Sequence, residues 1–398
     1  MKAQRGLRDL LLYAVVGSAL AMLALMFLSF PLGAYAFNDP GLGGISLGQQ
    51  VQALPVFLLG VALLVQLPAP LTLGEVFVLV WSLYLTFFVL LLMGPWSGVL
   101  SALRRLPSDK SLSIYSSGAL TLAVVFPATL VLAALMEAAL SYAGVPVGGL
   151  TQSDPRSFFY DLTLAPLIEE VGFRVSFVGL ASLAIAWGAT RKAGSLRALW
   201  HPSRALSEAG VQPWRSGLLY ASVAVSALAF GGAHVLYGGG WEAGKVISAT
   251  VVGAILAVVY YTHGLPAAVM LHWSFDYFQA AYQYFDQVRG LPGISTVTAV
   301  GPLASYTQTY VIYAVIFSAV MSYLYAALVI IRPAAARRSA FKGGEAEPAP
   351  VHAVGGNGQV GIPEAPGQIQ RGRPVRVLPD GRRRLRPHRQ GRNHDQLP

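Results

Sequence analysis

The chain has 398 residues, of which 55% are hydrophobic and only 12% are charged, about half the charged fraction of a soluble domain. It contains no cysteine, which excludes disulfides, thiolate nucleophiles and cysteine-based zinc sites. Residues 332–398 hold 13 Lys and Arg against 5 Asp and Glu, so they carry +8 of the net charge of +10. The basic charge therefore belongs to a tail and not to a nucleic-acid-binding fold, and we expect no nucleic-acid partner.

The first apolar segment, residues 9–30, follows Lys2, Arg5 and Arg8 and is long enough to cross a bilayer. We read it as a retained helix because the apolar region of a cleaved signal peptide is shorter. Further apolar segments predict spans at 74–94, 117–143, 161–189, 216–236, 243–262, 265–287 and 306–331. The segment 52–67 is short and ends at Leu67-Pro-Ala-Pro70, so it could be a short span, a re-entrant piece or an interfacial helix. The fold class is thus all-α, a polytopic transmembrane helix bundle of about eight spans.

Loop charge sets the expected orientation, since cytoplasmic loops carry an excess of Lys and Arg. Four regions are basic: the N-terminus, residues 104–110, residues 191–215 and the tail from Arg332. They fall on one side only if the chain has eight spans and 52–67 does not cross. We therefore expect an integral multi-pass protein with both termini cytoplasmic, in the plasma membrane if the source is prokaryotic.

The sequence predicts three parts of the chain: N-terminal transmembrane helices in 1–116, a helical core in 117–331 and a tail in 332–398. The tail is rich in Gly, Pro and Arg and poor in aromatic residues, so it cannot bury enough apolar surface to order itself. We expect a disordered cytoplasmic tail that contacts anionic lipid through a basic cluster made by Arg382, Arg383, Arg384 and Arg386.

Two adjacent carboxylates, Glu169 and Glu170, lie inside the apolar segment 161–189. A carboxylate in a membrane helix costs roughly 2.5 kcal/mol or more, so each marks a candidate functional site. Glu170 and Arg174 are four residues apart and can pair on one helix face. Glu169 is rotated by about 100° from Glu170, so one carboxylate can be neutralised by Arg174 while the other faces a polar cavity.

Two later segments carry further polar pairs at the same spacing of four residues. One is Phe230-Gly-Gly-Ala-His234 and the other is His272-Trp-Ser-Phe-Asp276. Any one of them alone is more typical of an interhelical contact, and Glu137 could be a structural contact with a loop backbone group. Together the three motifs predict side chains from separate helices that converge on one interior cavity.

The ordered set of motifs resembles the CPBP family of intramembrane proteases, which includes the type II CAAX prenyl endopeptidases and bacteriocin-processing and immunity-like proteins. The resemblance covers about residues 117–287 and implies a glutamic endopeptidase without a cofactor, acting on a membrane-bound or lipidated substrate, including prenylated CAAX-type proteins. It implies that Glu169 is the general base, with His234 as its partner in holding the water. His272 and Asp276 would stabilise the oxyanion, and the supporting residues would be Glu170, Arg174 and Phe230.

Several alternatives stay open. Glu169, His234 and His272 could bind zinc, although the His-Glu-x-x-His helix of zincins is absent. An ionised Asp276 only accepts hydrogen bonds, so it could orient His272 and leave His272 as the donor. The same fold could serve as a non-catalytic scaffold or immunity-type binding protein. A proton-coupled transporter is a third reading, but the sequence lacks the repeated halves typical of transporters.

Overall fold

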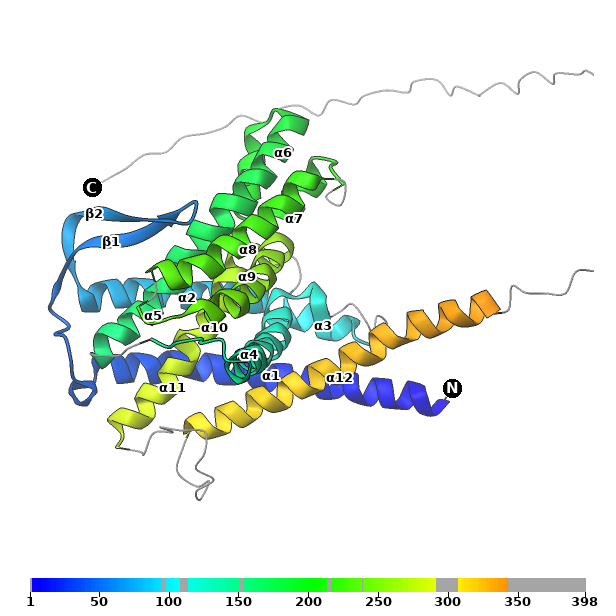
Figure 1. Cartoon of the computed structure of the whole chain (residues 1–398), viewed down its shortest axis with the longest axis horizontal. Helices are drawn as coiled ribbons and strands as arrows, with labels where there is room; N and C mark the ends of the chain where they lie inside the picture. The colour runs from blue at the N-terminus through cyan, green and yellow to red at the C-terminus, as the bar shows by residue number, and fades with distance from the viewer. Residues whose placement is uncertain are drawn as a thin grey trace, which may run out of the picture. The chain divides into compact units, whose positions relative to one another are not determined.

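The fold is a bundle of helices packed around a short central helix, with one β-hairpin on its side (Figure 1). The computed structural model describes residues 2–94, 98–107, 114–150, 154–212, 216–237, 239–290 and 307–342. The α-helices are α1 (Lys2–Asn38), α2 (Leu73–Met93), α3 (Val99–Arg105), α4 (Gly118–Tyr142), α5 (Pro155–Glu169), α6 (Leu180–Thr190), α7 (Pro202–Glu208), α8 (Gly217–Tyr237), α9 (Ala243–His263), α10 (Leu265–Phe275), α11 (Tyr277–Val288) and α12 (Thr307–Lys342). The other elements are η1 (Pro40–Leu42), η2 (Ile114–Ser116), the π-helix η3 (Glu170–Gly179), η4 (Ala193–Leu199) and the strands β1 (Gln50–Leu58) and β2 (Val61–Thr72).

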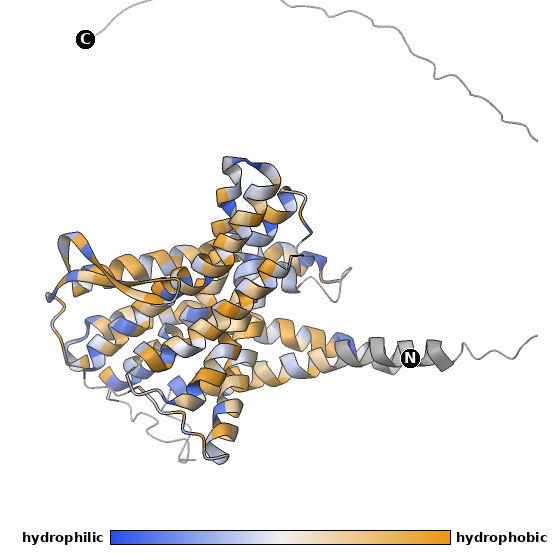
Figure 2. Cartoon of the chain, turned by 45° about the horizontal axis from the view of Figure 1, so that its top comes forward, coloured by the Kyte–Doolittle hydropathy of each residue, from blue (hydrophilic) through white to orange (hydrophobic). Residues whose placement is uncertain are grey.

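Seven helical stretches among the described residues are long and apolar enough to cross a membrane. Apolar residues follow most of the length of these helices (Figure 2). The seven stretches correspond to seven of the predicted spans, with α5, η3 and α6 forming one stretch. The remaining predicted span, 265–287, is present as α10 and α11, which follow one another and break at Asp276. The prediction of an all-α polytopic bundle is confirmed.

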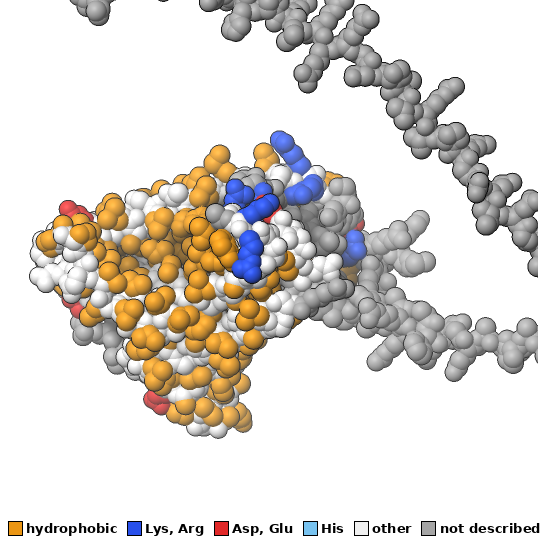
Figure 3. Space-filling view, turned by 90° about the horizontal axis from the view of Figure 1, so that it is seen from above, with side chains coloured by type: hydrophobic (Ala, Val, Ile, Leu, Met, Phe, Trp, Pro, Cys, Tyr) orange, Lys and Arg blue, Asp and Glu red, His pale blue; other side chains and the backbone are white. Residues whose placement is uncertain are grey.

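Two polar contacts show that α4 and α9 run antiparallel. At one end His263 of α9 is hydrogen-bonded to Thr121 near the start of α4. At the other end Lys245 of α9 is bonded to Glu137 near the end of α4. Lys and Arg side chains gather at one end of the molecule, and acidic ones on the same face lie mainly at the opposite end (Figure 3). The backbone N–H of Leu265, just after His263, donates to the backbone oxygen of Trp200, so the basic loop around η4 and α7 lies at the His263 end of α9, away from Lys245.

The segment 52–67 is a β-hairpin, so its predicted reading as a helical or re-entrant piece is wrong. β1 and β2 pair antiparallel, with Leu58 opposite Val61 across a two-residue turn. Leu59 and Gly60 have φ of 49° and 77° in this turn, the positive pair that a type I′ hairpin requires. Pro55 has no backbone N–H and therefore disfavours a helix at this position. The apolar run is short, and such a run alone does not distinguish a strand from a helix.

The C-terminal helix is longer than predicted. α12 ends at Lys342, eleven residues into the segment 332–398 for which we expect disorder. The reason is local composition, because residues 334–340 are mostly Ala and Arg, which are strong helix formers. The rest of the predicted tail, 343–398, lies outside the described residues.

Helix α10 forms the centre of the bundle, since every residue from Pro266 to Ser274 is buried. Trp273 stacks on Phe30 of α1, with 4.8 Å between ring centroids, and on Tyr277 at 5.2 Å. The Tyr277 hydroxyl donates to the backbone oxygen of Phe30. Burial of rings of this size contributes several kcal/mol of stability and fixes α10 against α1. His272 precedes Trp273 and is rotated from it by about 100°, so this packing also fixes the direction of His272.

Candidate active site

The two adjacent glutamates have different surroundings. Glu170 is fully buried and its Oε2 lies 3.3 Å from Nε of Arg174, whose side chain is also 0% exposed. The Glu169 side chain is 22% exposed and lines a cavity. This separation is the one expected from the rotation between neighbouring helical positions. Glu170 is therefore a buried, paired carboxylate, and Glu169 is the one available to a ligand.

The local helix geometry at this point is unusual. Residues 170–179 form a π-helix, and Ser176 Oγ donates to the backbone oxygen of Val171, five residues earlier. π-Helical turns often occur at functional sites. Gly172 lies between Glu170 and Arg174, and a Cβ added there would overlap Cβ and backbone atoms of Phe57. Glycine thus lets strand β1 pack directly against the helix that carries the two glutamates.

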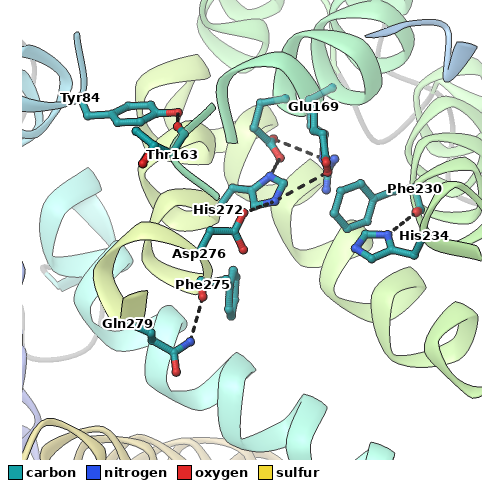
Figure 4. A network of polar contacts seen from close by, with 11 residues as sticks. Tyr84, Thr163, Glu169, Phe230, His234, His272, Phe275, Asp276 and Gln279 are labelled. Carbon is teal, nitrogen blue, oxygen red and sulfur yellow. Dashed lines mark hydrogen bonds and ion pairs between the residues drawn. The ribbon is translucent and has the colours of Figure 1, made fainter. Parts of the chain in front are cut away.

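His272 of α10 lies among three carboxylates (Figure 4). Its Nδ1 is 2.8 Å from Glu170 Oε1, and because an ionised carboxylate only accepts, Nδ1 carries the proton of this bond. Its Nε2 is 3.4 Å from Asp276 Oδ2 and 3.8 Å from Glu169 Oε2. Glu170 therefore fixes the ring orientation from one side, and Nε2 is directed toward the other two carboxylates.

His234 of α8 approaches the same region from another wall. Its Nδ1 is 2.9 Å from the backbone oxygen of Phe230, so Nδ1 donates and Nε2 of the neutral ring is left as an acceptor. The Phe230 ring packs against His234 at 4.7 Å and His272 at 5.5 Å between centroids. The guanidinium of Arg174 lies 4.0 Å above the same ring. Phe230 thus holds the two histidines and the arginine in fixed relative positions.

One cavity of about 710 Å³ joins the three motifs. Glu169, His234, His272 and Asp276 all line it, together with Phe230. The convergence predicted from the sequence is therefore found, although it does not by itself establish the role of any side chain. Phe57 of β1 also lines the cavity, so the hairpin contributes to its wall.

A second polar group lines the same cavity, and the sequence analysis named its Glu137 but missed the partners of Glu137. Glu137 of α4 accepts from Lys245 Nζ at 2.8 Å and from Ser248 Oγ at 2.7 Å. The predicted contact of Glu137 with a loop backbone group is therefore wrong, because side chains of α9 take that place. The signal available in the sequence was a lysine in the first turn of an apolar helix, three residues after Glu242.

The alternative zinc site has no support from the grouping of side chains. Among the described residues, no three His, Asp or Glu side chains are placed as joint ligands of one metal ion. His234 makes its polar contact with a backbone carbonyl, and Glu169 Oε2 lies 3.8 Å from Nε2 of His272. Chelation remains the direct test of a metal.

Comparison with known proteins gives one match. Residues 152–278, which contain all three motifs, match the family model of the type II CAAX prenyl endopeptidases, described as Rce1-like. No curated protein and no solved structure matches the chain. The resemblance to CAAX-type intramembrane proteases predicted from the motifs is confirmed over this part of the chain.

Proposed function

We propose that this multi-pass membrane protein, with its match to the type II CAAX prenyl endopeptidases, is an endopeptidase of the glutamic type. It hydrolyses a peptide bond of a membrane-bound or lipidated substrate inside the 710 Å³ cavity. The observation that carries the proposal is the difference between the two glutamates. Glu170 is paired and fully buried, whereas Glu169 faces the cavity beside His272.

In the proposed reaction, Glu169 accepts a proton from a water molecule while the water oxygen attacks the carbonyl carbon of the scissile bond. His234 Nε2, the free acceptor of that ring, accepts the second hydrogen of the water and holds it in place. The tetrahedral intermediate then loses its C–N bond, and Glu169 returns the proton to the leaving amine. Two acceptors on one water direct its lone pair toward the substrate carbonyl.

His272 is our candidate for stabilising the oxyanion of that intermediate. Its Nε2 faces the cavity, and a donor aimed at a developing oxyanion contributes about 3–4 kcal/mol in a site shielded from water. Asp276, when ionised, has no hydrogen to donate. The donor is the ring of His272 protonated on both nitrogens, so we assign Asp276 to orienting its Nε2–H and Glu170 to holding its Nδ1–H.

The cavity's surroundings support a membrane-bound substrate. Most of its wall is formed by α4, α5, α8, α9 and α10, with contributions from β1 and η3. The lining is largely apolar, so a peptide held in the bilayer can enter without crossing a wide polar surface. The matched family is named for prenylated CAAX-type proteins, and such a peptide is the first to test. By the charge of its loops, we place the basic end of the bundle in the cytoplasm.

Cleavage of a membrane-anchored peptide by the purified protein in lipid nanodiscs tests the proposal. Glu169→Gln keeps the size of the side chain and removes its basicity, so we expect at least a 100-fold loss of kcat with an unchanged Tm. A zinc chelator should leave the wild type active. Full activity of Glu169→Gln would exclude the glutamate mechanism, and loss of activity on chelation would favour zinc.

A further inference from the structure

Lys245 stands apart from the other charged groups of the cavity. It is the one Lys or Arg among the described residues that line it, whereas Glu137, Asp161, Glu169 and Asp276 supply four carboxylates. It lies in the first turn of α9, where the partial positive charge of the helix N-terminus disfavours a cation. The stability of α9 therefore does not account for a lysine at this position.

The ammonium group of Lys245 is held in a fixed position. Nζ is 2.8 Å from Glu137 Oε1 and lies 4.0 Å from the centroid of the Trp241 ring. Ser248 Oγ donates to the same oxygen of Glu137 at 2.7 Å and fixes that carboxylate in turn. An ammonium group has three donors, and the side chain of Lys245 is 18% exposed, so it can take a further acceptor.

The position of Lys245 along the cavity relates it to the reaction centre. Lys245, Ser248, Ala249 and Val252 line the cavity from one face of α9, over seven residues or about 10 Å. An extended peptide covers that length with about three residues. Gly253, next to Val252, packs against the ring of Phe230. A substrate group bound at Lys245 is thus within about three residues of a bond held beside Phe230 in the same cavity.

We propose, on the basis of the proposed peptidase function, that Lys245 forms a subsite for a carboxylate of the substrate. The carboxylate is either the C-terminus of the peptide or the side chain of an Asp or Glu. The remaining cavity carboxylates repel an anion elsewhere, so only one register of the peptide places its charge favourably. The subsite selects which bond meets Glu169.

The ion pair of Glu137 and Lys245 could instead serve only to hold α4 against α9, and the experiment separates this structural role from a substrate subsite. Randomised peptides are offered to the protein in nanodiscs as three libraries. One has a free C-terminal carboxylate, one has a C-terminal amide, and one has an amide end with a single Glu placed at successive positions. Cleavage products are identified and kcat/KM is compared between libraries by mass spectrometry.

We expect the wild type to cleave one of the two acidic libraries at least 10-fold better than the amide library, and which one identifies the source of the carboxylate. Lys245→Met should reduce this ratio to near one, and Lys245→Arg should keep most of it. Glu137→Gln removes the competing carboxylate while keeping an acceptor, so the ratio should rise. Glu137→Gln tests the subsite even if Lys245→Met does not fold.

Three results would overturn the inference. The wild type could show no preference for an acidic peptide, or prefer a cationic one, or Lys245→Met could keep the full preference. Any of these, with peptides still cleaved, refutes the subsite and leaves the peptidase intact. Absence of all cleavage by the wild type refutes the peptidase proposal and the subsite together.

Discussion

The buried pair of Glu170 and Arg174 provides a quantitative test of the site's architecture. Both side chains are 0% exposed and their charged atoms are 3.3 Å apart. Replacing Arg174 with Met leaves the Glu170 carboxylate buried without its cation, and breaking such a pair costs about 3–5 kcal/mol. That is a large part of the roughly 5–15 kcal/mol by which folded proteins are stable.

The double variant Glu170→Gln/Arg174→Met removes both charges and keeps an acceptor for Nδ1 of His272. It should be more stable than Arg174→Met alone, with a coupling energy of at least about 1 kcal/mol between the two sites. Unfolding by SDS titration of the protein in mixed micelles measures all four members of the cycle.

The matched control is Arg197→Met, which removes an arginine that is 75% exposed and 3.6 Å from Glu208. An exposed pair contributes at most about 1 kcal/mol, so this variant should unfold close to the wild type. The reasoning is refuted if Arg174→Met costs no more than Arg197→Met. It is also refuted if the effects in the double variant are simply additive.

Three further predictions concern other parts of the molecule. Gly172→Ala should push β1 off η3 and cost about 1–3 kcal/mol by overpacking, seen as a lower Tm; an unchanged Tm would show that the hairpin does not pack there. Since the chain has no cysteine, a single Arg197→Cys should react with an impermeant maleimide only from the cytoplasmic side and Gly149→Cys only from the other side; the same pattern for both would contradict the orientation. Burial, helped by the charge of Arg204, lowers the pKa of His201 below its usual 6.5, so the folded state disfavours its protonation. The stability that the neutral His201 contributes is present above pH 6.5 and is lost as the pH falls. Between pH 7.5 and pH 5 the Tm of the wild type should therefore fall further than the Tm of His201→Gln. Equal falls in Tm would contradict the lowered pKa of His201.

The parts of the site that follow from helix periodicity could be predicted from the sequence. A spacing of four residues places Glu170 with Arg174 and His272 with Asp276, and the structure contains both contacts. The cost of a carboxylate in a membrane helix identified Glu169 as a candidate before any contact was known. The spacing of residues along a helix and the free-energy cost of burying a carboxylate therefore identified the motifs that line the cavity.

Features that depend on contacts between distant segments could not be predicted. The hairpin was missed because an apolar run of this length is compatible with either a strand or a helix. The close packing of Gly172 in the π-helix against Phe57 of β1 joins segments that are more than a hundred residues apart in sequence. Likewise, the bond between Glu170 and His272 and the contact of Lys245 with Glu137 each require the tertiary fold to bring two helices together.

The most direct test of the account compares the termini of membrane peptides in cells that express wild type or Glu169→Gln at equal levels, each with and without a zinc chelator. The account predicts peptide termini that are present with wild type, absent with the variant and unaffected by chelation. Identical termini with wild type and variant would contradict it and favour the non-catalytic scaffold. Termini lost on chelation would place a metal in the reaction instead.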